Sequence, residues 1–310
     1  MPHNRLVMAD HTAQAPATIA FAGATLDRAT HLRSDADRLR QLDTSRALLV
    51  GRDQEVALTD AGRLALTPTA ELQADEPLTF LGLDESGAAL FACDALALPP
   101  GPGAPKTPPV VSLRTLATEL DAAEAALAAY AVGMVGWHRV TRYCGRSRHV
   151  TVLDAAGHRR RCPGCGLVQF PRTDPVVTML VTASGRCLLS RRVGSPENRW
   201  SALAGFMEQG ETPEQAVVRE AREETGIAVE RVEYVASQPW PFPAALMLGF
   251  WAFADPDDAS APAPEPDELL AARWWDRAEL DDALRREQIV LPPPGSIGNY
   301  LISTWLAGGD

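Results

Sequence analysis

Three glutamates crowd the end of one short stretch of the chain, "LAGFMEQGETPEQAVVREAREETGIAV" at residues 203–229. Glu220, Glu223 and Glu224 are spaced i, i+3 and i+4, so a helix would place all three on one patch of one face. Carboxylate oxygens are the ligands that Mg²⁺ or Mn²⁺ prefers, and Mg²⁺ usually shares its other positions with water and substrate phosphates. One interpretation is therefore a divalent-metal site that acts on a phosphate ester or pyrophosphate.

An ordinary surface helix is the other interpretation of this cluster. Arg219 and Arg222 are interleaved with the glutamates, and a solvated helix face often has this composition. Like charges at these spacings repel by roughly a few tenths of a kcal/mol per pair unless a cation lies between them. The cluster by itself leaves both interpretations open.

Local signals fix the ends of the helix that carries the glutamates. Thr212 has an N-cap side chain, Pro213 suits the first helical position, and Gln215 completes a Thr-x-x-Gln capping box. Gly226 offers the left-handed C-cap. The sequence therefore predicts a helix over residues 213–225.

The composition of the whole chain limits the classes of protein to consider. The 310 residues suffice for two domains, and the net charge of −11 argues against nonspecific binding of nucleic acid or membrane surfaces. The N-terminal stretch has no signal-peptide pattern, and the longest apolar run, 244–254, is shorter than the roughly 18 residues of a membrane span. Five cysteines with one close pair fit the reducing cytoplasm.

Composition and periodicity divide the chain into four parts. Residues 1–110 mix short apolar runs with polar breaks, which predicts a small α+β domain ending in a proline- and glycine-rich stretch, 98–110. Apolar residues at three- and four-residue spacing predict an amphipathic connecting helix over 111–139; they are Leu113, Leu116, Leu120, Ala123 and Leu127. Residues 140–169 carry most of the cysteines.

The last part, 170–310, alternates strands with helices. Two apolar runs around Ser184-Gly185 predict a hairpin. The glutamate helix follows, then strands in "ERVEYVAS" and "ALMLGFWAFA", an acidic proline-rich insertion, a further apolar run in "LLAARWW", and a C-terminal helix. This order predicts an α/β sandwich.

The glutamate stretch resembles the Nudix box, G-x5-E-x7-R-E-U-x-E-E-x-G-U, where U is apolar. Every specified position is filled, the apolar ones by Ala221 and Ile227 and the fixed ones by Gly205, Glu211, Arg219, Glu220, Glu223, Glu224 and Gly226. Nine positions at fixed spacing favour the metal interpretation over the surface helix.

The resemblance implies a Nudix α/β/α sandwich that hydrolyses a nucleoside diphosphate linked to another group, with Mg²⁺ or Mn²⁺. It implies that Glu220, Glu223 and Glu224 bind metal and that Glu211 assists near the loop. Arg219 is expected to orient carboxylates by ion pairing. We also expect Glu224 to be partly exposed, so that exchange for glutamine would abolish turnover and preserve the fold.

A second stretch, "SQPWPFP" at residues 237–243, resembles the S-Q-P-W-P-F-P-x-S motif of NADH pyrophosphatases. Three prolines around two aromatic rings predict a stiff loop, and flat rings suit stacking on a base or a nicotinamide. The resemblance implies that Phe206 and Trp240 flank the nicotinamide, with Gln238 nearby. Ala245 stands where the family has the final serine, which removes a polar contact.

Three further stretches extend the resemblance from about residue 112 to the end of the chain, whereas residues 1–110 match no motif. They are "WHRVTRYCG" with "RCPGCGLVQFPRTDP", then "DELLAARWW", and "LPPPGSIGNYLI". Phe170 occupies a place that the family usually gives to tyrosine. The resemblance implies that Glu268 helps to bind metal or activate water and that Gly298 lies among the substrate-binding residues.

The cysteine segment resembles the zinc ribbon of this family, C-x2-C-x14-C-x2-C. Cys162 and Cys165 form the second knuckle, but the first reads Cys144-Gly-Arg-Ser147, with serine at one ligand position. Structural zinc usually has four donors, and neutral serine is a poor one. His149 or His158 is a candidate fourth donor; alternatively, the knuckles have lost the metal and kept their turns.

The resemblance implies an NAD(H) pyrophosphatase that yields AMP and nicotinamide mononucleotide and that removes NAD caps from RNA. It also implies a homodimer whose Ser-Gln-Pro-Trp loop lies near the partner. Two alternatives are another Nudix specificity, such as ADP-ribose or a sugar nucleotide, and a nucleotide-sensing protein without turnover. The "SQPWPFP" stretch disfavours the first, and the complete set of carboxylates disfavours the second.

Overall fold

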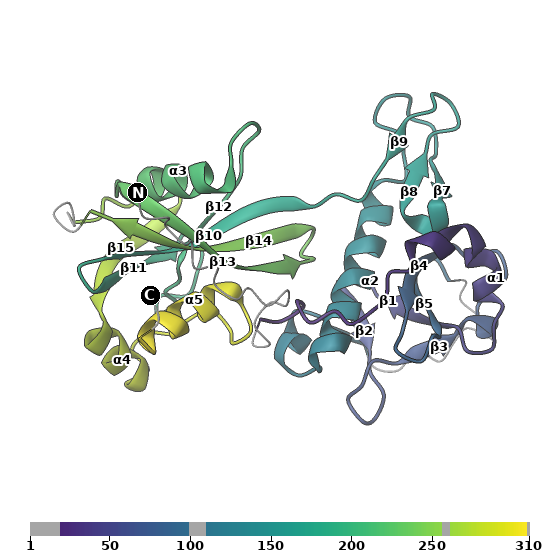
Figure 1. The fold of residues 1–310 in the computed structure, drawn as a ribbon, viewed down its shortest axis with the longest axis horizontal. Coiled ribbons are helices and arrows are strands. Elements are labelled where there is room, and N and C mark those ends of the chain that lie inside the picture. The colour runs from purple at the N-terminus through teal and green to yellow at the C-terminus, as the bar shows by residue number, and fades with distance from the viewer. Residues whose placement is uncertain (1–18, 99–109, 256–260, 309–310) are drawn as a thin grey trace, which may run out of the picture.

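The structure is a computed structural model that describes residues 19–98, 110–255 and 261–308. Two sheet-based domains are joined by a long helix and a small three-stranded unit (Figure 1). Parts of two predicted segments, the linker 98–110 and the acidic insertion after Ala254, lie outside the described residues. No helix in the described part of the chain combines the length and apolarity that a membrane crossing needs.

The N-terminal domain is built on a six-stranded sheet in the order β4-β5-β1-β2-β6, with β3 paired to β1. β1 and β5 are parallel, and the other pairs are antiparallel. Its elements are η1 Thr30–Asp35, α1 Ala36–Arg40, β1 Arg46–Val50, β2 Glu55–Ala57, β3 Leu66–Pro68, η2 Thr69–Glu71, β4 Leu78–Leu83, β5 Ala89–Asp94 and β6 Val110–Ser112. The predicted α+β class for this domain is therefore confirmed.

The expected connecting helix over 111–139 differs from what the structure shows. Residues 110–112 form β6 of the N-terminal sheet, residues 115–118 form the short η3, Thr115–Thr118, and α2 runs only from Ala122 to Val140. Asp121 caps α2 by accepting a hydrogen bond from the Glu124 backbone N–H at 2.8 Å. The cap stops the helix from extending towards Leu113, so apolar spacing alone misplaced its start.

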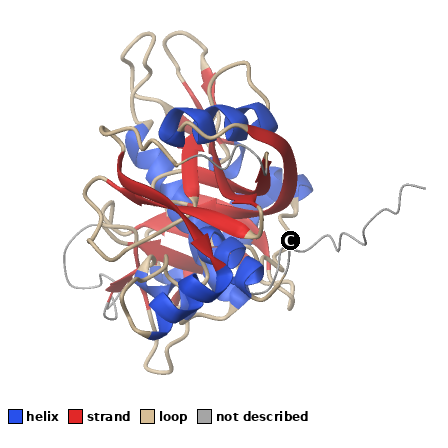
Figure 2. Cartoon of the chain, turned by 90° about the vertical axis from the view of Figure 1, so that its left-hand side faces the viewer, coloured by secondary structure: helices blue, strands red, loops and turns tan. Residues whose placement is uncertain are grey.

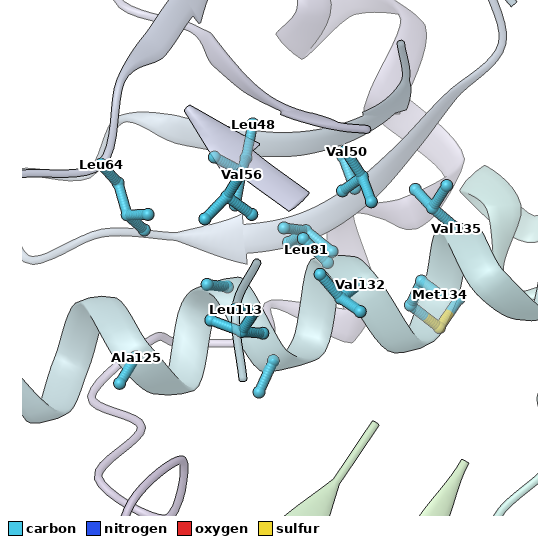
Figure 3. Packing of buried hydrophobic residues seen from close by; sticks show 14 of the residues in the cluster. Leu48, Val50, Val56, Leu64, Leu81, Leu113, Ala125, Val132, Met134 and Val135 are labelled. Carbon is cyan, nitrogen blue, oxygen red and sulfur yellow. The ribbon is translucent and has the colours of Figure 1, made fainter. Parts of the chain in front are cut away.

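α2 packs on the N-terminal sheet and belongs to that domain. Figure 3 shows its apolar face against strand residues such as Leu48, Val56 and Leu81. Leu113 lies in the same cluster although it precedes the helix. Core burial therefore explains the apolar spacing that the sequence displays over this whole stretch.

The connector is a three-stranded antiparallel sheet in the order β7-β8-β9, which projects at the upper right of Figure 1. Its elements are β7 Val152–Asp154, η4 Ala155–Gly157, β8 Arg159–Arg161 and β9 Val168–Gln169. Gly157 packs so closely against Thr79 that an added Cβ would lie 2.5 Å from its hydroxyl oxygen. The connector is thus seated on the N-terminal domain.

The C-terminal domain is an α/β/α sandwich, as predicted. Its sheet has the order β13-β14-β10-β11-β15, with β12 paired to β10. Its strands are β10 Asp174–Ala183, β11 Arg186–Arg192, β12 Leu203–Phe206, β13 Val229–Trp240, β14 Ala245–Ala254 and β15 Leu269–Asp276. Ser184 and Gly185 both have positive φ between β10 and β11, which confirms the predicted hairpin.

Helices cover both faces of this sheet (Figure 2). Alternate residues of β10 point to opposite sides, so Val177, Met179 and Val181 pack beneath α3, whereas Leu180 packs towards α4 and α5. The helices are α3 Pro213–Thr225, α4 Arg277–Arg285 and α5 Ile297–Leu306.

The ends of α3 are those that its sequence predicts. The Thr212 hydroxyl accepts from the Gln215 backbone N–H at 3.3 Å, and the Gln215 side chain accepts from the Thr212 N–H at 2.8 Å. Gly226 ends the helix with a φ of 74°. Local chemistry alone is enough to place the glutamate helix correctly.

Candidate active site

Arg219 gathers the carboxylates of α3 and of the preceding loop. Its guanidinium donates to both Glu211 oxygens at 2.6 and 3.0 Å, and to Glu220 and Glu223 at 2.9 Å each. It also donates to the Phe206 carbonyl at 2.9 Å. The hydrogen bonds to the carboxylates raise the pKa of Arg219, and the hydrogen bonds from Arg219 to Glu211 lower the pKa of Glu211. Arg219 therefore stays charged and fixes the loop against the helix.

Gly205 makes room for the Glu220 carboxylate. An added Cβ at Gly205 would lie 1.9 Å from the Glu220 Cδ. The backbone there is held by the pairing of β12 with β10, where Gly205 is opposite Val177. Burial raises the pKa of Glu220, and Arg219 partly offsets that effect. The first glycine of the box is thus explained by a side chain fifteen positions later.

Glu224 is buried, with only 2% of its surface exposed, so the expectation of partial exposure was wrong. The irregular segment before β15 lies against this end of α3, where the Glu265 N–H donates to the Glu224 carbonyl at 2.9 Å. Burial raises the pKa of Glu224 to about 7, although Arg192 pairs with it. Its Oε2 atom is buried without any hydrogen-bond partner.

The residues fit a divalent cation. A buried carboxylate oxygen that lacks a donor costs about 1 to 3 kcal/mol or more, and a cation would remove that cost. Glu268 is exposed, and its charge adds to the raised pKa of both Glu220 and Glu224. Within the described residues, no three of these carboxylates converge to 4.8 Å, and Glu220 and Glu224 are each paired with an arginine.

Arg192 is a site residue that the sequence did not reveal. It ends β11, 32 positions before Glu224, and its Nη2 donates to the Glu224 Oε1 at 2.7 Å and to the carbonyl of Ala204. The signal for it was an arginine pair, Arg191 and Arg192, at the end of an apolar strand. That pattern is common at strand ends, so it carries little information without the fold.

Two aromatic rings are open to solvent: Phe206, whose carbonyl accepts from Arg219 at the site, and Phe170, which directly follows β9 of the connector. Phe206 follows Gly205 on β12 and is 64% exposed, and Phe170 precedes β10 and is 66% exposed. Both are free to stack on a flat ring. Gly298 lies in the first turn of α5, where an added Cβ would meet only Pro292 at an ordinary 3.7 Å.

Gln238 and Trp240 join the two domains. Gln238 is 1% exposed, its amide nitrogen donates to the carbonyls of Ala20 and Gly295, and its amide oxygen accepts from the Ile297 N–H. The Trp240 ring packs near Phe21, with centroids 6.0 Å apart. In this structure, both polar atoms of the Gln238 side chain are hydrogen-bonded to backbone groups of the protein.

The expected stiff loop is instead mostly strand. β13 continues through Trp240, and a tight turn at 241–244 leads into β14. Trp240 and Ala245 line a cavity of about 980 Å³ between the domains, which is not lined by any of the box glutamates. The "SQPWPFP" stretch thus faces the N-terminal domain on one side and this cavity on the other.

Three cysteines meet at the connector. The Sγ atoms of Cys144, Cys162 and Cys165 all lie within 4.8 Å of one another, and Cys144 and Cys165 are 3.7 Å apart. The Ser147 hydroxyl is 3.1 Å from the Cys162 Sγ and occupies the fourth corner. Hydrogen bonds from Ser147 lower the pKa of Cys144 to about 6 and also lower that of Cys162. Both shifts are in the direction that favours the thiolate form, which binds metal.

The two candidate histidines lie in different places. The His149 Nδ1 is 3.2 Å from the Ser147 Oγ, at the edge of the cysteine cluster. His158 instead contacts the Phe80 carbonyl through its Nε2 at 2.7 Å and lies beside Tyr130. His158 thus lies where the connector packs on the N-terminal domain, and His149 is the histidine next to the cysteine cluster.

The raised pKa of Glu224 predicts a pH-dependent response to metal. An acid whose folded pKa is about 7, against an ordinary 4.5, binds more protons when folded. As the pH rises from about 4.5 to about 7, the free energy of unfolding of the metal-free protein should therefore fall by up to about 3 kcal/mol, at about 1.4 kcal/mol per pKa unit.

We expect Mn²⁺ to raise the melting temperature more at pH 8 than at pH 5.5. An equal Mn²⁺ shift at both values, or the same profile in Glu224→Gln, would contradict this.

Comparison with known proteins accords with this architecture. Residues 172–292 match the family model described as the NUDIX domain, and residues 24–137 match the NADH pyrophosphatase-like rudimentary NUDIX domain. The N-terminal domain, in which the sequence offered no motif, is therefore a second Nudix-type unit. Its helix α2 lacks the box glutamates. The fold and the site together define a Nudix hydrolase.

Individual relatives show to which family of Nudix hydrolases the chain belongs. The chain is 36% identical over 294 residues to the NAD-capped RNA hydrolase NudC of Mycobacterium bovis, covering 91% of this chain and 92% of that protein. The same figures hold for NudC of Mycobacterium tuberculosis. It is 35% identical over 208 residues to the mitochondrial NAD(P)H pyrophosphatase NUDT13 of Mus musculus, covering 63% of this chain and 59% of that protein. The chain belongs to the NADH pyrophosphatase family of Nudix hydrolases.

Proposed function

We propose that the protein hydrolyses the pyrophosphate bond of NAD(H) to give AMP and nicotinamide mononucleotide, and that it removes NAD caps from RNA by the same cut. The observation that carries this proposal is the buried Glu224 oxygen without a partner, set beside Glu220 on a complete Nudix helix. The names of the relatives, NudC over most of the chain and NUDT13 over 63% of it, support the choice of substrate.

Mg²⁺ or Mn²⁺, held by Glu220, Glu224, Glu223 and Glu268, would neutralise charge that develops on the pyrophosphate. The protein supplies the geometry. Arg219 keeps the loop and the helix in register, and the buried carboxylates lie where little water competes for their charge. Water is the nucleophile, and one phosphorus–oxygen bond of the anhydride is broken.

Phe206 is the ring that would select the nicotinamide or adenine half by stacking, since it is largely exposed and its carbonyl accepts from Arg219. Phe170, equally exposed just after β9 of the connector, is a second candidate ring. Ala245 has no hydroxyl to offer, so recognition there rests on shape. A second copy of the chain completes the pocket in this proposal, which gives a homodimer. The reducing cytoplasm is its place of action.

Product analysis with purified protein tests the proposal. NADH, NAD⁺, NAD-capped RNA, ADP-ribose and a sugar nucleotide would be incubated separately with Mg²⁺ or Mn²⁺, and the products separated by chromatography. We expect AMP and nicotinamide mononucleotide from the first two and a 5′-monophosphate end from the RNA. Faster turnover of ADP-ribose or the sugar nucleotide would instead assign another Nudix specificity, and no turnover of any would favour a sensor.

We propose too that the connector binds zinc through Cys144, Cys162 and Cys165, with the weak Ser147 oxygen in fourth position. Metal analysis of the protein purified without added zinc should give about one zinc per chain. Ser147→Cys completes a four-thiolate set and should slow zinc loss to a chelator at least about tenfold. Zinc absent from both proteins would contradict the proposal, and His149→Ala tests whether the neighbouring ring contributes.

A further inference from the structure

The Arg192 guanidinium lies where a cation would lie. One nitrogen, Nη2, donates both to the Glu224 Oε1 at 2.7 Å and to the backbone carbonyl of Ala204. A carboxylate oxygen and a backbone carbonyl are the oxygen donors that a hard divalent cation takes. The guanidinium therefore binds the same kind of donors that a metal in this site would use.

Arg192 is held less firmly than the carboxylate it contacts. Its side chain is 49% exposed, whereas that of Glu224 is 2% exposed. It stands at the last position of β11, next to Val193, whose N–H donates to the Glu268 carbonyl at 2.9 Å. Among the described residues Glu224 is the carboxylate that pairs with Arg192. The arginine can swing into solvent, and the glutamate cannot.

We infer that Arg192 is a placeholder, which neutralises Glu224 in the metal-free protein and yields it to the divalent cation, so that its guanidinium becomes free to bind the phosphates of the substrate. A metal bound at the partnerless Oε2 of Glu224 would lie close to the guanidinium on Oε1, and the two positive charges would repel each other. A pyrophosphate offers the released guanidinium bidentate acceptors in place of Glu224 and Ala204. This inference rests on the proposed function of the same site.

The alternative role for Arg192 is permanent support of Glu224. A permanent support would keep Glu224 oriented for the metal, so its removal would weaken metal binding. A placeholder competes with the metal, so its removal should strengthen metal binding while weakening substrate binding. The two roles therefore predict opposite signs for the change in metal affinity.

Arg192→Gln separates these roles when Mn²⁺ binding is measured on the substrate-free protein. We expect the Mn²⁺ dissociation constant to fall about tenfold and the KM for NADH to rise about 10- to 100-fold, as loss of a charge-assisted hydrogen bond to phosphate would cause. Arg192→Lys should recover part of the KM, because a lysine still supplies a point charge. Melting temperatures of the metal-free variants would establish that they fold.

Arg222→Gln is the matched control. Arg222 lies on α3 two positions before Glu224 and is exposed, and it forms no ion pair within the described residues. Arg222→Gln removes one positive charge near the same glutamate, without altering the ion pair of Glu224. Both the Mn²⁺ affinity and the KM of this variant should therefore stay within about threefold of wild type, as for an exposed charge. An equal gain in Mn²⁺ affinity in Arg222→Gln would show that the effect is only general electrostatics.

The outcomes distinguish this inference from the proposed function. Weaker Mn²⁺ binding in Arg192→Gln, or an unchanged KM, would overturn the placeholder role while wild-type hydrolysis of NADH stands. A wild-type protein that binds no Mn²⁺ and leaves NADH intact would overturn the proposed function instead.

Discussion

Glu224→Gln should reduce the turnover of NADH by at least about 10³-fold at saturating Mn²⁺. The amide has the shape of the carboxylate but no negative charge, and loss of one electrostatic contact to a reacting pyrophosphate typically costs about 10²- to 10³-fold. The loss of rate in Glu224→Gln should lie at the upper end of this range or beyond it, because the Glu224 oxygens lie in a buried site where charge is poorly screened.

Burial also fixes what should happen to stability in this variant. Burying a neutral amide costs less than burying a carboxylate, so the metal-free variant should melt no lower than wild type near pH 8. Mn²⁺ should no longer raise its melting temperature. Glu214→Gln, the same exchange at an exposed position in the first turn of α3, is the control for turnover. If Glu224→Gln kept a turnover within tenfold of wild type, the assignment of Glu224 to the active site would be wrong.

Gly205→Ala should lower turnover by about 10²-fold through Glu220. The new methyl would lie 1.9 Å from the Glu220 Cδ, which is closer than any real contact, and β12 cannot retreat because it is paired to β10. The carboxylate must therefore rotate away from its place beside Arg219 and from the metal. A misplacement of about 1 Å can cost about 10²-fold in rate.

A double variant makes the cause of this loss testable. Glu220→Asp shortens the side chain, so Gly205→Ala should add little further loss in that background, and the two effects should be non-additive. Gly136→Ala, where an added Cβ meets nothing within 4 Å, controls for the loss of a glycine. Additive losses, with a Glu220 side chain that has not moved in a crystal structure, would rule out the steric explanation.

The sequence alone determined the features that depend on neighbours along the chain. The capping box at Thr212 and Gln215 and the left-handed Gly226 set α3, and Ser184-Gly185 set the hairpin before it. Each is decided within a few residues, because hydrogen bonds and φ preferences act locally. The spacing of the box then sufficed to identify the fold of the C-terminal domain and the class of chemistry.

The predicted start of α2 was wrong because it depended on contacts between residues that are not neighbours along the chain. The apolar spacing continues back to Leu113, but Leu113, Leu116 and Leu120 pack into the same core from η3 and the turns on either side of it, and Asp121 caps the helix only after them. Periodicity records which residues are buried and not which element carries them. The rudimentary Nudix nature of the first domain was likewise invisible, since its helix keeps the shape and none of the box acids.

Only the tertiary structure decided how the site residues are used. Glu224 is buried where the irregular segment before β15 meets the end of α3, since the Glu265 N–H donates to the Glu224 carbonyl, and its side chain meets Arg192 from β11. Gln238 and Trp240, which the resemblance implies lie beside the nicotinamide, contact the N-terminal domain in this structure. His149 rather than His158 adjoins the cysteines. Burial and partner choice are set by contacts between distant segments, and these follow from packing of the whole chain rather than from local spacing.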